Sequence, residues 1–331
     1  MKIIVTGATG FLGSYLIREL LNCHYQVVAI GRNKDKLKKL ENLGAQILQL
    51  NLTDVEMVYK LWPTDADIVI HAAALSTIYG PYNEFYKHNV EVTNTVLNVS
   101  KVTNIKRFIH VSSPSIYTTQ QDRMDIKENE FDSNNCLNNY IRTKIQAEEL
   151  LQKHHGTMEL VIVRPRGLFG IGDTSIFPRL LKAHQTIGVP LFKRKKPIVI
   201  DITCVENVAY ALRLCCETSN INGEIFNITN NEPMEFKMII ERIFKGLDKP
   251  PQFKIMNTKL IYPIAAILES FYRLFSIKSE PALTRYTVCT LAYSQTLNIR
   301  NAQEKLGYKP ALSIFEGIDQ YVHYIQQEDK Q

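Results

Sequence analysis

The sequence has 331 residues and lacks the cysteine patterns of disulfide frameworks and zinc sites. None of its six cysteines forms a C-x-x-C pair, and none lies near histidines at zinc-binding spacing. Most of them have apolar neighbours, where cysteine behaves as a small hydrophobic residue. We therefore expect a reducing compartment and no bound metal.

Export signals and a strong charge of one sign are also scarce. The apolar run at the N-terminus is too short for a signal peptide and leads directly into a glycine loop, so we expect a cytoplasmic protein. The formal net charge of +6 is mild for this length and suits an anionic cofactor or a membrane surface as well as nucleic acid. No dense Lys/Arg tract dominates, and we expect no nucleic-acid partner.

The apolar stretch at residues 260–275 is shorter than the roughly 20 apolar residues of a membrane span, and Glu269 and Arg273 interrupt it. We favour a buried helix in a substrate lobe. The alternative is an amphipathic helix that makes peripheral membrane contact or lines the entry for a lipophilic substrate.

The first 165 residues contain a regular alternation of strands and helices. We expect strands at residues 3–5, 26–30, 46–50, 67–71, 107–111 and 160–163, separated by helices at residues 11–22, 35–43, 83–102 and 138–154. Continuous apolar strands between helices predict an α/β fold with a doubly wound parallel sheet, the Rossmann arrangement, covered on both faces.

After residue 165 the pattern loosens. Strand-like residues 197–202 and 223–228 flank a helix expected at residues 205–217. We predict an NAD(P)-binding Rossmann domain at residues 1–170. Residues 171–331 are expected to form mainly a smaller C-terminal substrate lobe, with some segments returning to the Rossmann domain.

A glycine loop, residues 6–13, joins the first expected strand to the first expected helix. Gly7, Gly10 and Gly13 permit a tight turn, close approach of the backbone to a diphosphate, and close packing of the helix. The N-terminus of that helix offers free N–H groups and the positive end of its dipole. This context predicts a dinucleotide cofactor.

The end of the second expected strand bears on which dinucleotide is bound. A carboxylate there would accept the ribose 2′-OH of NAD, whereas an arginine suits the 2′-phosphate of NADP. This sequence has Arg32 and Asn33, with Lys36 one helical turn after Arg32, and no acid at the strand end. We predict NADP. NAD stays the alternative, because Arg32 could stack on adenine without selecting the phosphate.

The G-x-x-G-x-x-G spacing resembles that of the short-chain dehydrogenase/reductase superfamily, and the chain length resembles its extended branch. Residues 71–74 are similar to the motif after the fourth strand, residues 51–54 to the segment whose aspartate lies by the adenine, and Asn89 to a helix asparagine. With the residues discussed below, the cofactor contacts that we predict are Gly7, Thr9, Gly10, Phe11, Leu12, Gly13, Arg32, Asn33, Lys36, Leu52, Asp54, Ala72, Ala73, Ala74, Asn89, Tyr140, Lys144, Pro165, Gly167 and Leu168.

Tyr140 and Lys144 stand at i and i+4, on one face of the helix expected between the fifth and sixth strands. The superfamily carries its catalytic pair there, and residues 112–117 resemble its serine motif, so the resemblance implies Ser113, Tyr140 and Lys144 as catalytic residues. A free tyrosine has a pKa near 10, and a nearby ammonium group favours its phenolate. We expect Tyr140 to be the general acid in reduction and the general base in oxidation. Lys144 would lower the Tyr140 pKa and hold the nicotinamide ribose, and Ser113 would bind the substrate oxygen.

Pro114 and Ser115 stand where sugar-nucleotide dehydratases carry an Asp-Glu pair, which argues against dehydration. Residues 111–117, 164–173, 201–208 and 280–286 resemble 3β-hydroxysteroid dehydrogenase-like proteins and bacterial 2-alkyl-3-oxoalkanoate reductases. The resemblance implies hydride transfer between nicotinamide and a lipophilic keto or hydroxy compound, steroid-like or 3-oxoacyl-like. A nucleotide-sugar 4-epimerase or dehydrogenase and a non-catalytic NAD(P)-binding protein stay open as alternatives. Two long helices of the first domain could form a homodimer contact, as in many relatives.

Overall fold

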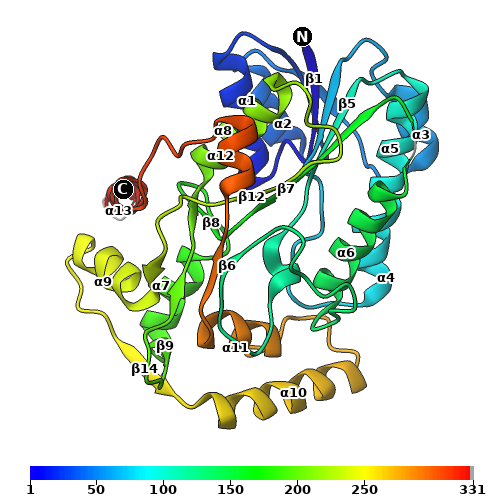
Figure 1. Ribbon diagram of the computed structural model, residues 1–331. Helices are drawn as coiled ribbons and strands as arrows, with labels where there is room; N and C mark the ends of the chain where they lie inside the picture. Colours follow the sequence, from blue (N-terminus) through cyan, green and yellow to red (C-terminus); the bar gives the residue numbers. More distant parts are fainter. Residues whose placement is uncertain (155, 329–331) are drawn as a thin grey trace.

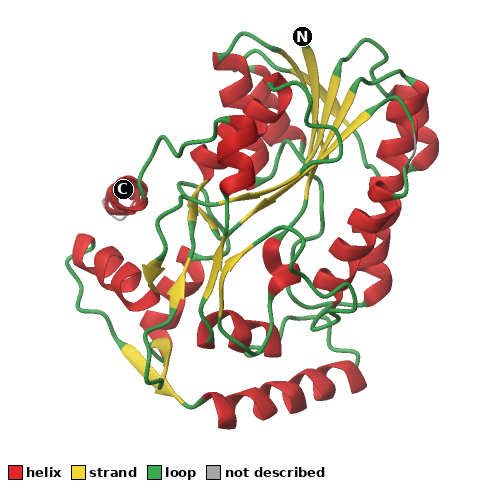
Figure 2. Cartoon of the chain, in the orientation of Figure 1, coloured by secondary structure: helices red, strands yellow, loops and turns green. Residues whose placement is uncertain are grey.

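The computed structural model describes residues 1–154 and 156–328 and is built around a seven-stranded parallel sheet (Figures 1 and 2). In spatial order its strands are β12 (Ile225–Ile228), β7 (Glu159–Pro165), β5 (Arg107–Val111), β4 (Ile68–His71), β1 (Lys2–Thr6), β2 (Gln26–Gly31) and β3 (Gln46–Gln49). Every neighbouring pair is parallel. The predicted doubly wound Rossmann sheet is confirmed.

Helices cover both faces of this sheet (Figure 1). One face carries α1 (Phe11–Asn22), α2 (Lys34–Glu41), α8 (Val205–Glu217) and α12 (Arg300–Leu306); the other carries α3 (Val55–Leu61), α5 (Val92–Val102) and α6 (Asn139–Gln152). Successive strand residues point to opposite faces, so Ile3 and Val5 join the first layer and Ile4 the second. Strands buried on both faces explain the continuous apolar runs in the sequence.

The strand order reverses between β1 and β4. From β1 the chain winds toward β3 on one side, and from β4 it winds toward β12 on the other. The helices that leave β1 and β4 therefore diverge and open a crevice at the carboxyl ends of these two strands. Open α/β sheets bind their ligands at this place.

A second lobe with its own apolar core is formed mainly by residues after β7, with β6 added from the first half of the chain. Its strands are β6 (Arg123–Ile126), β10 (Val199–Ile200), β13 (Met234–Glu235) and β15 (Gln295–Leu297) in a four-stranded sheet, with the pairs β8 (Leu168–Phe169) and β11 (Thr203–Cys204), and β9 (Val189–Phe192) and β14 (Phe253–Met256). Its helices are α7 (Phe177–Thr186), α9 (Phe236–Gly246), α10 (Thr258–Leu274), α11 (Arg285–Ala292) and α13 (Ile314–Glu328). Three segments from this half of the chain, β12, α8 and α12, instead pack with the large sheet.

Two sequence predictions of element bounds differ from the structure. The single helix expected over 83–102 is divided into α4 (Tyr82–Tyr86), a π-helical turn at Lys87–Glu91, and α5. The strand expected over 197–202 shortens to the two residues of β10. Strand β6 was not predicted; its short sequence RMDI has exposed positions and no clear apolar alternation.

The favoured interpretation of residues 260–275 as a buried helix is wrong. Helix α10 forms the outer edge of the second lobe (Figure 1), and only Ala265 and Glu269 are buried in it. These two positions are one turn apart on the side that packs against α11. The large apolar residues that stay exposed are Leu260, Ile264, Ile267, Phe271, Leu274 and, just after the helix, Phe275. No helix in the described ranges is long and apolar enough to cross a membrane.

Candidate active site

A cleft of about 1620 Å³ lies at the carboxyl ends of the large sheet's strands. The loops that follow β1, β2, β3, β4, β5 and β7 line one side of it, and residues of the second lobe line the other. Of the predicted site residues, those that line this cleft are Gly7, Thr9, Gly10, Phe11, Leu12, Gly13, Arg32, Lys36, Leu52, Ala72, Ala73, Ala74, Ser113, Tyr140, Lys144, Pro165, Gly167 and Leu168.

The glycine loop at the crevice cannot carry side chains at two of its positions. Gly7 has φ +70°, and a Cβ there would lie 2.7 Å from the backbone nitrogen of Ala73. A Cβ on Gly13 would overlap the carbonyl oxygen of Gly7. The loop therefore lies directly against the segment after β4 and against the first turn of α1.

Helix α1 begins at this loop with no side chain capping it, because its N-cap residue is Gly10. The first N–H groups of a helix have no partner within the helix and attract an anion. A narrow glycine cradle that ends in uncapped N–H groups fits the diphosphate of a dinucleotide, so the residues present fit the implied cofactor.

The far end of the cofactor side of the cleft is basic. Arg32, Lys36 and Lys39 line it together with His88. The pKa of His88 is lowered by its burial and by the charge of Arg32. Among the described residues, no Asp or Glu lines this end, since the acids of the cleft, Asp201 and Glu280, belong to the second lobe.

Asn33, Asp54 and Asn89, three predicted cofactor contacts, do not line the cleft. Asn33 accepts a hydrogen bond from the N–H of Lys36 (2.9 Å) and caps α2; Asp54 accepts from the N–H of Met57 (3.1 Å) and caps α3. These are the ordinary bonds of N-cap residues.

Asn89 is buried in the π-helical turn, and its side chain forms hydrogen bonds with neighbouring segments of the protein. Its side-chain oxygen accepts from the N–H of Leu75 at 2.7 Å, and its amide nitrogen donates to the Thr143 hydroxyl at 3.1 Å. It thereby ties the loop after β4 to α6, the helix that carries Tyr140 and Lys144.

Ser113, Tyr140 and Lys144 come together on one wall of the cleft. Ser113 follows β5, and its hydroxyl is hydrogen-bonded to that of Ser115 at 2.8 Å. Tyr140 lies in the first turn of α6, and Lys144 follows one turn later. The Lys144 ammonium group is buried and donates to the carbonyl of Val111 at 2.9 Å.

Burial shifts the pKa of both helix residues. It raises the pKa of Tyr140 to about 12, and a hydrogen-bonding interaction with Ser113 opposes part of the rise. It lowers the pKa of Lys144 to about 8, opposed by the charge of Glu148. Burial, Ser113 and Tyr286 are the influences on the Tyr140 pKa, whereas Lys144 is held by Val111. The expected effect of Lys144 on Tyr140 thus stays a prediction.

A buried ion pair supports this wall from below. Glu148, one turn after Lys144, pairs with Arg164 of β7, whose Nε donates to the carboxylate at 2.9 Å. The hydroxyl of Ser112 also donates to Glu148. Both partners of the pair are essentially inaccessible to water, so the pair fixes α6 against β5 and β7.

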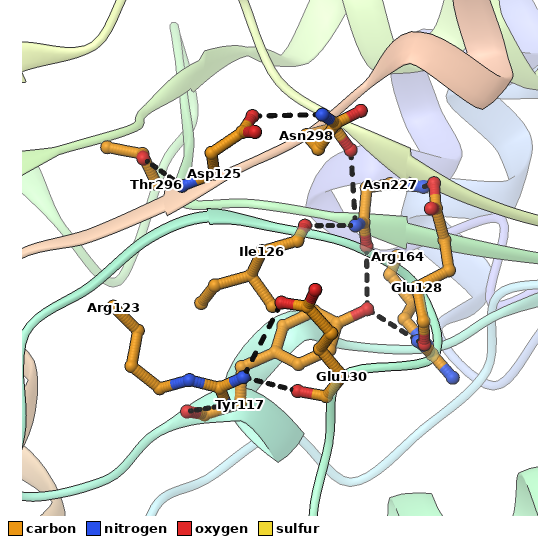
Figure 3. A network of polar contacts seen from close by, with 10 residues as sticks. All are labelled: Tyr117, Arg123, Asp125, Ile126, Glu128, Glu130, Arg164, Asn227, Thr296 and Asn298. Carbon is orange, nitrogen blue, oxygen red and sulfur yellow. Dashed lines mark hydrogen bonds and ion pairs between the residues drawn. The ribbon is translucent and has the colours of Figure 1, made fainter.

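The network continues from Arg164 toward the second lobe (Figure 3). The guanidinium donates to the hydroxyl of Tyr117, which donates to the side-chain oxygen of Asn227 at 2.9 Å. The Asn227 amide nitrogen donates to the carbonyls of Ile126 (3.1 Å) and Asn298 (3.3 Å). Tyr117 belongs to the serine motif, but its distant partners gave no signal in the sequence.

Several polar residues that we did not predict as site residues also line the cleft. Among them are Arg166, directly after β7, and, on the side formed by the second lobe, Asp201 and Tyr286 in the first turn of α11. Most of the other lining residues of this side are apolar, among them Ile176, Leu180, Ile202, Phe236 and Leu291.

A doubly wound sheet with a glycine cradle, faced by a serine, a tyrosine and a lysine, defines an NAD(P)-dependent enzyme of the extended short-chain dehydrogenase/reductase class. Residues 3–229 match the model of the NAD dependent epimerase/dehydratase family, and the chain belongs to that family. The predicted family, enzyme class and oxidoreductase activity are confirmed at this level.

Relatives align along nearly the whole chain. Uncharacterized protein YbjS of Escherichia coli K12 is 30% identical and covers 100% of this chain and 99% of its own length. A 2-alkyl-3-oxoalkanoate reductase of Shewanella oneidensis is 28% identical (95% and 84%). A decarboxylating sterol-4-alpha-carboxylate 3-dehydrogenase of Candida albicans is 27% identical (99% and 98%).

Among solved structures, UDP-glucuronic acid 4-epimerase from Bacillus cereus, in complex with UDP-glucuronic acid and NAD, is similar. Its TM-score is 0.76 at 25% identity, and the match covers 99% of this chain and all of that one. The likeness agrees with the Rossmann fold and with a nicotinamide dinucleotide cofactor.

Proposed function

We propose that the protein is an NADP(H)-dependent oxidoreductase that transfers a hydride between nicotinamide and a lipophilic keto or hydroxy compound. The observation that carries the proposal is that Ser113, Tyr140 and Lys144 share one cleft with the glycine cradle. The apolar lining of the second lobe supports a lipophilic substrate. The named functions of the reductase and the sterol dehydrogenase agree with it.

The residues present can hold the cofactor and the reacting oxygen. The glycine loop and the first turn of α1 would bind the diphosphate, and Pro165, Gly167 and Leu168 would border the nicotinamide. When bound, the cofactor supplies or accepts the hydride. Ser113 would hold the substrate oxygen and stabilise its developing charge.

Tyr140 moves the proton in this scheme. With a pKa near 12 it is a neutral phenol at physiological pH, the form that donates a proton to the oxygen of a reduced carbonyl. Oxidation needs the phenolate, which the cofactor's positive charge and Lys144 would favour.

Tyr140→Phe tests this assignment. Loss of the proton donor should lower kcat for NADPH-dependent ketone reduction by roughly 100-fold or more, with NADPH binding and the melting temperature retained. Tyr82→Phe is the matched control. The Tyr82 hydroxyl donates to Gln146 of α6, the helix that carries Tyr140, but Tyr82 does not line the cleft. Undiminished turnover by Tyr140→Phe would reject Tyr140 as the acid.

The preference for NADP rests on the basic end of the cleft. Arg32, Lys36 and Lys39 offer three cations for a 2′-phosphate, and no carboxylate stands at the end of β2 to accept a free ribose 2′-OH. Nucleotide-sugar epimerisation is the second candidate, supported by the structural likeness. It predicts tightly held NAD, inhibition by UDP and little net redox.

The exposed face of helix α10 supports the proposal that the protein contacts an anionic lipid surface. Its exposed apolar residues recur every three or four positions, and residues 253–279 contain four cations (Lys254, Lys259, Arg273 and Lys278). The one acid at residues 253–279 is Glu269, which is paired with Arg285. An apolar face with a basic border is the pattern of helices that lie in a membrane interface.

The homodimer stays a prediction. The outward positions of α5 and α6 include polar side chains such as Asn94, Arg142 and Gln146.

A further inference from the structure

Two buried arginines stand two residues apart where β7 enters the cleft, and among the described residues only one of the two guanidinium groups has partners. Arg164 is fully buried, forms the ion pair with Glu148, and donates to the Tyr117 hydroxyl and to the carbonyl of Glu128. Arg166 is 7% exposed. Within the described chain its guanidinium has no hydrogen bond or ion pair, and its Nε is buried without a partner.

Burying an unpaired cation is costly, so a side chain in this state calls for a counter-charge. Asp201 is the nearest carboxylate that influences Arg166, but the two do not come within the 4.0 Å of an ion pair. Asp201 is itself buried and accepts the N–H of Leu297 at 2.7 Å. Burial also raises the pKa of Asp201 to about 6, which weakens it as a permanent counter-ion.

The position of Arg166 relates it to the reacting centre. It lines the cleft, and Tyr286 of α11 interacts electrostatically with both Arg166 and Tyr140. Its neighbours Asp201 and Tyr286 belong to the second lobe, whereas the glycine cradle for the diphosphate lies across the crevice at β1. An anion bound by Arg166 would thus belong to the substrate and lie close to the oxygen that meets Tyr140.

We propose that Arg166 binds a carboxylate on the substrate, so that the enzyme acts on lipophilic keto or hydroxy acids in preference to their neutral esters or ketones. This inference rests on the proposed oxidoreductase function. A guanidinium binds a carboxylate through two parallel hydrogen bonds, which would satisfy the buried cation and fix the substrate's orientation. The apolar lining beside it would take the alkyl part.

The test compares 3-hydroxydecanoate with its methyl ester as substrates for oxidation with NADP⁺. The wild type should prefer the acid. Arg166→Gln should lower kcat/KM for the acid by roughly 30-fold or more, mainly through KM, and leave the ester unchanged. Arg166→Lys should restore part of the preference, and the affinity for NADP⁺ should stay constant in all variants.

Arg179→Gln is the matched control, because Arg179 also lines the cleft but is paired with Glu280 at 2.8 and 3.0 Å. It should keep the wild-type ratio of acid to ester. Equal use of acid and ester by the wild type, an equal loss for both in Arg166→Gln, or a selective loss in Arg179→Gln instead would overturn the inference.

A binding measurement separates this inference from the proposed function. 3-Hydroxydecanoate is titrated into the enzyme–NADPH complex, followed by cofactor fluorescence, for the wild type and Arg166→Gln. Carboxylate binding that depends on Arg166 without turnover of either compound would reject the oxidoreductase proposal and keep the carboxylate site. Equal turnover of acid and ester would keep the oxidoreductase proposal and reject the carboxylate site. Absence of carboxylate binding would also reject the site.

Discussion

At the scale of residues, burial shifts the pKa values of Tyr140 and Lys144 in the cleft. The same effect raises the pKa of the Tyr140 phenol and lowers that of the Lys144 ammonium, because each loses hydration of its charged form. Glu148 opposes the shift of Lys144 and is itself held by Arg164. The ion pair below the catalytic wall therefore influences the charge of the wall as well as its position.

Arg32 is the residue on which cofactor choice depends most directly. Arg32→Ala should weaken NADPH binding roughly 10-fold or more and leave NADH binding nearly unchanged, since a hydrogen bond between charged groups is lost only with the 2′-phosphate. Fluorescence titration with both nucleotides measures this. Lys34→Ala is the control, because Lys34 is an exposed cation two residues after Arg32, at the start of α2, and does not line the cleft. A wild type that prefers NADH would contradict the NADP assignment.

Local motifs predicted the residues of the cofactor wall. The segments with Arg166, Asp201 and Tyr286 also showed a family resemblance, but the sequence assigned these three residues no role. The glycine loop and the Tyr140–Lys144 pair are encoded within a few positions of one element. Arg166, Asp201 and Tyr286 are far apart in the sequence and meet only when the second lobe folds back. Conversely, we predicted Asn33 and Asp54 as cofactor contacts, whereas in the structure they are the N-cap residues of α2 and α3.

At the scale of elements, strands of the large sheet were predictable because their apolar runs are continuous, and helix α10 shows why apolar content does not predict burial. Its apolar positions follow the helical period, but the side that packs on α11 is formed around the small Ala265 and the paired Glu269. Ile261 and Tyr262 are partly buried against the lobe's core, and the large apolar residues Ile264, Ile267 and Phe271 turn outward. The sequence pattern fits either a buried or an interfacial helix, and the neighbouring elements decide.

Exposure of α10 leads to a prediction about lipid. Ile267→Glu and Phe271→Glu should abolish co-sedimentation with vesicles of 30% phosphatidylserine in phosphatidylcholine, because they put charge on an apolar face that is 71% and 50% exposed at these residues. Val102→Glu is the control, since Val102 is similarly exposed (70%) at the end of α5. Lipid contact would be refuted if the wild type did not co-sediment with these vesicles. A dimer that Ile267→Glu dissociates would refute it as well.

At the scale of the whole molecule, the active site is a joint product of the two lobes. The large sheet brings its carboxyl ends, the glycine cradle and Arg166 after β7, and the lobe brings the apolar lining with Asp201 and Tyr286. Glu148 of the catalytic helix pairs with Arg164. From Arg164 the network continues through Tyr117 to Asn227 of β12 (Figure 3). Family motifs on the sheet therefore predict the class of reaction, and we propose that the lining of the lobe selects the substrate.

Transfer of deuterium from NADPH labelled at both C4 positions tests the central claim of hydride transfer most directly. The purified protein is incubated with labelled NADPH and a panel of lipophilic 3-oxo compounds, and the products are examined by mass spectrometry. We predict alcohols carrying one deuterium at the new carbinol carbon, in amounts equal to the NADPH consumed. Unlabelled ketones with NADPH unchanged, while UDP-sugars are interconverted by the same preparation, would contradict it and establish epimerisation instead.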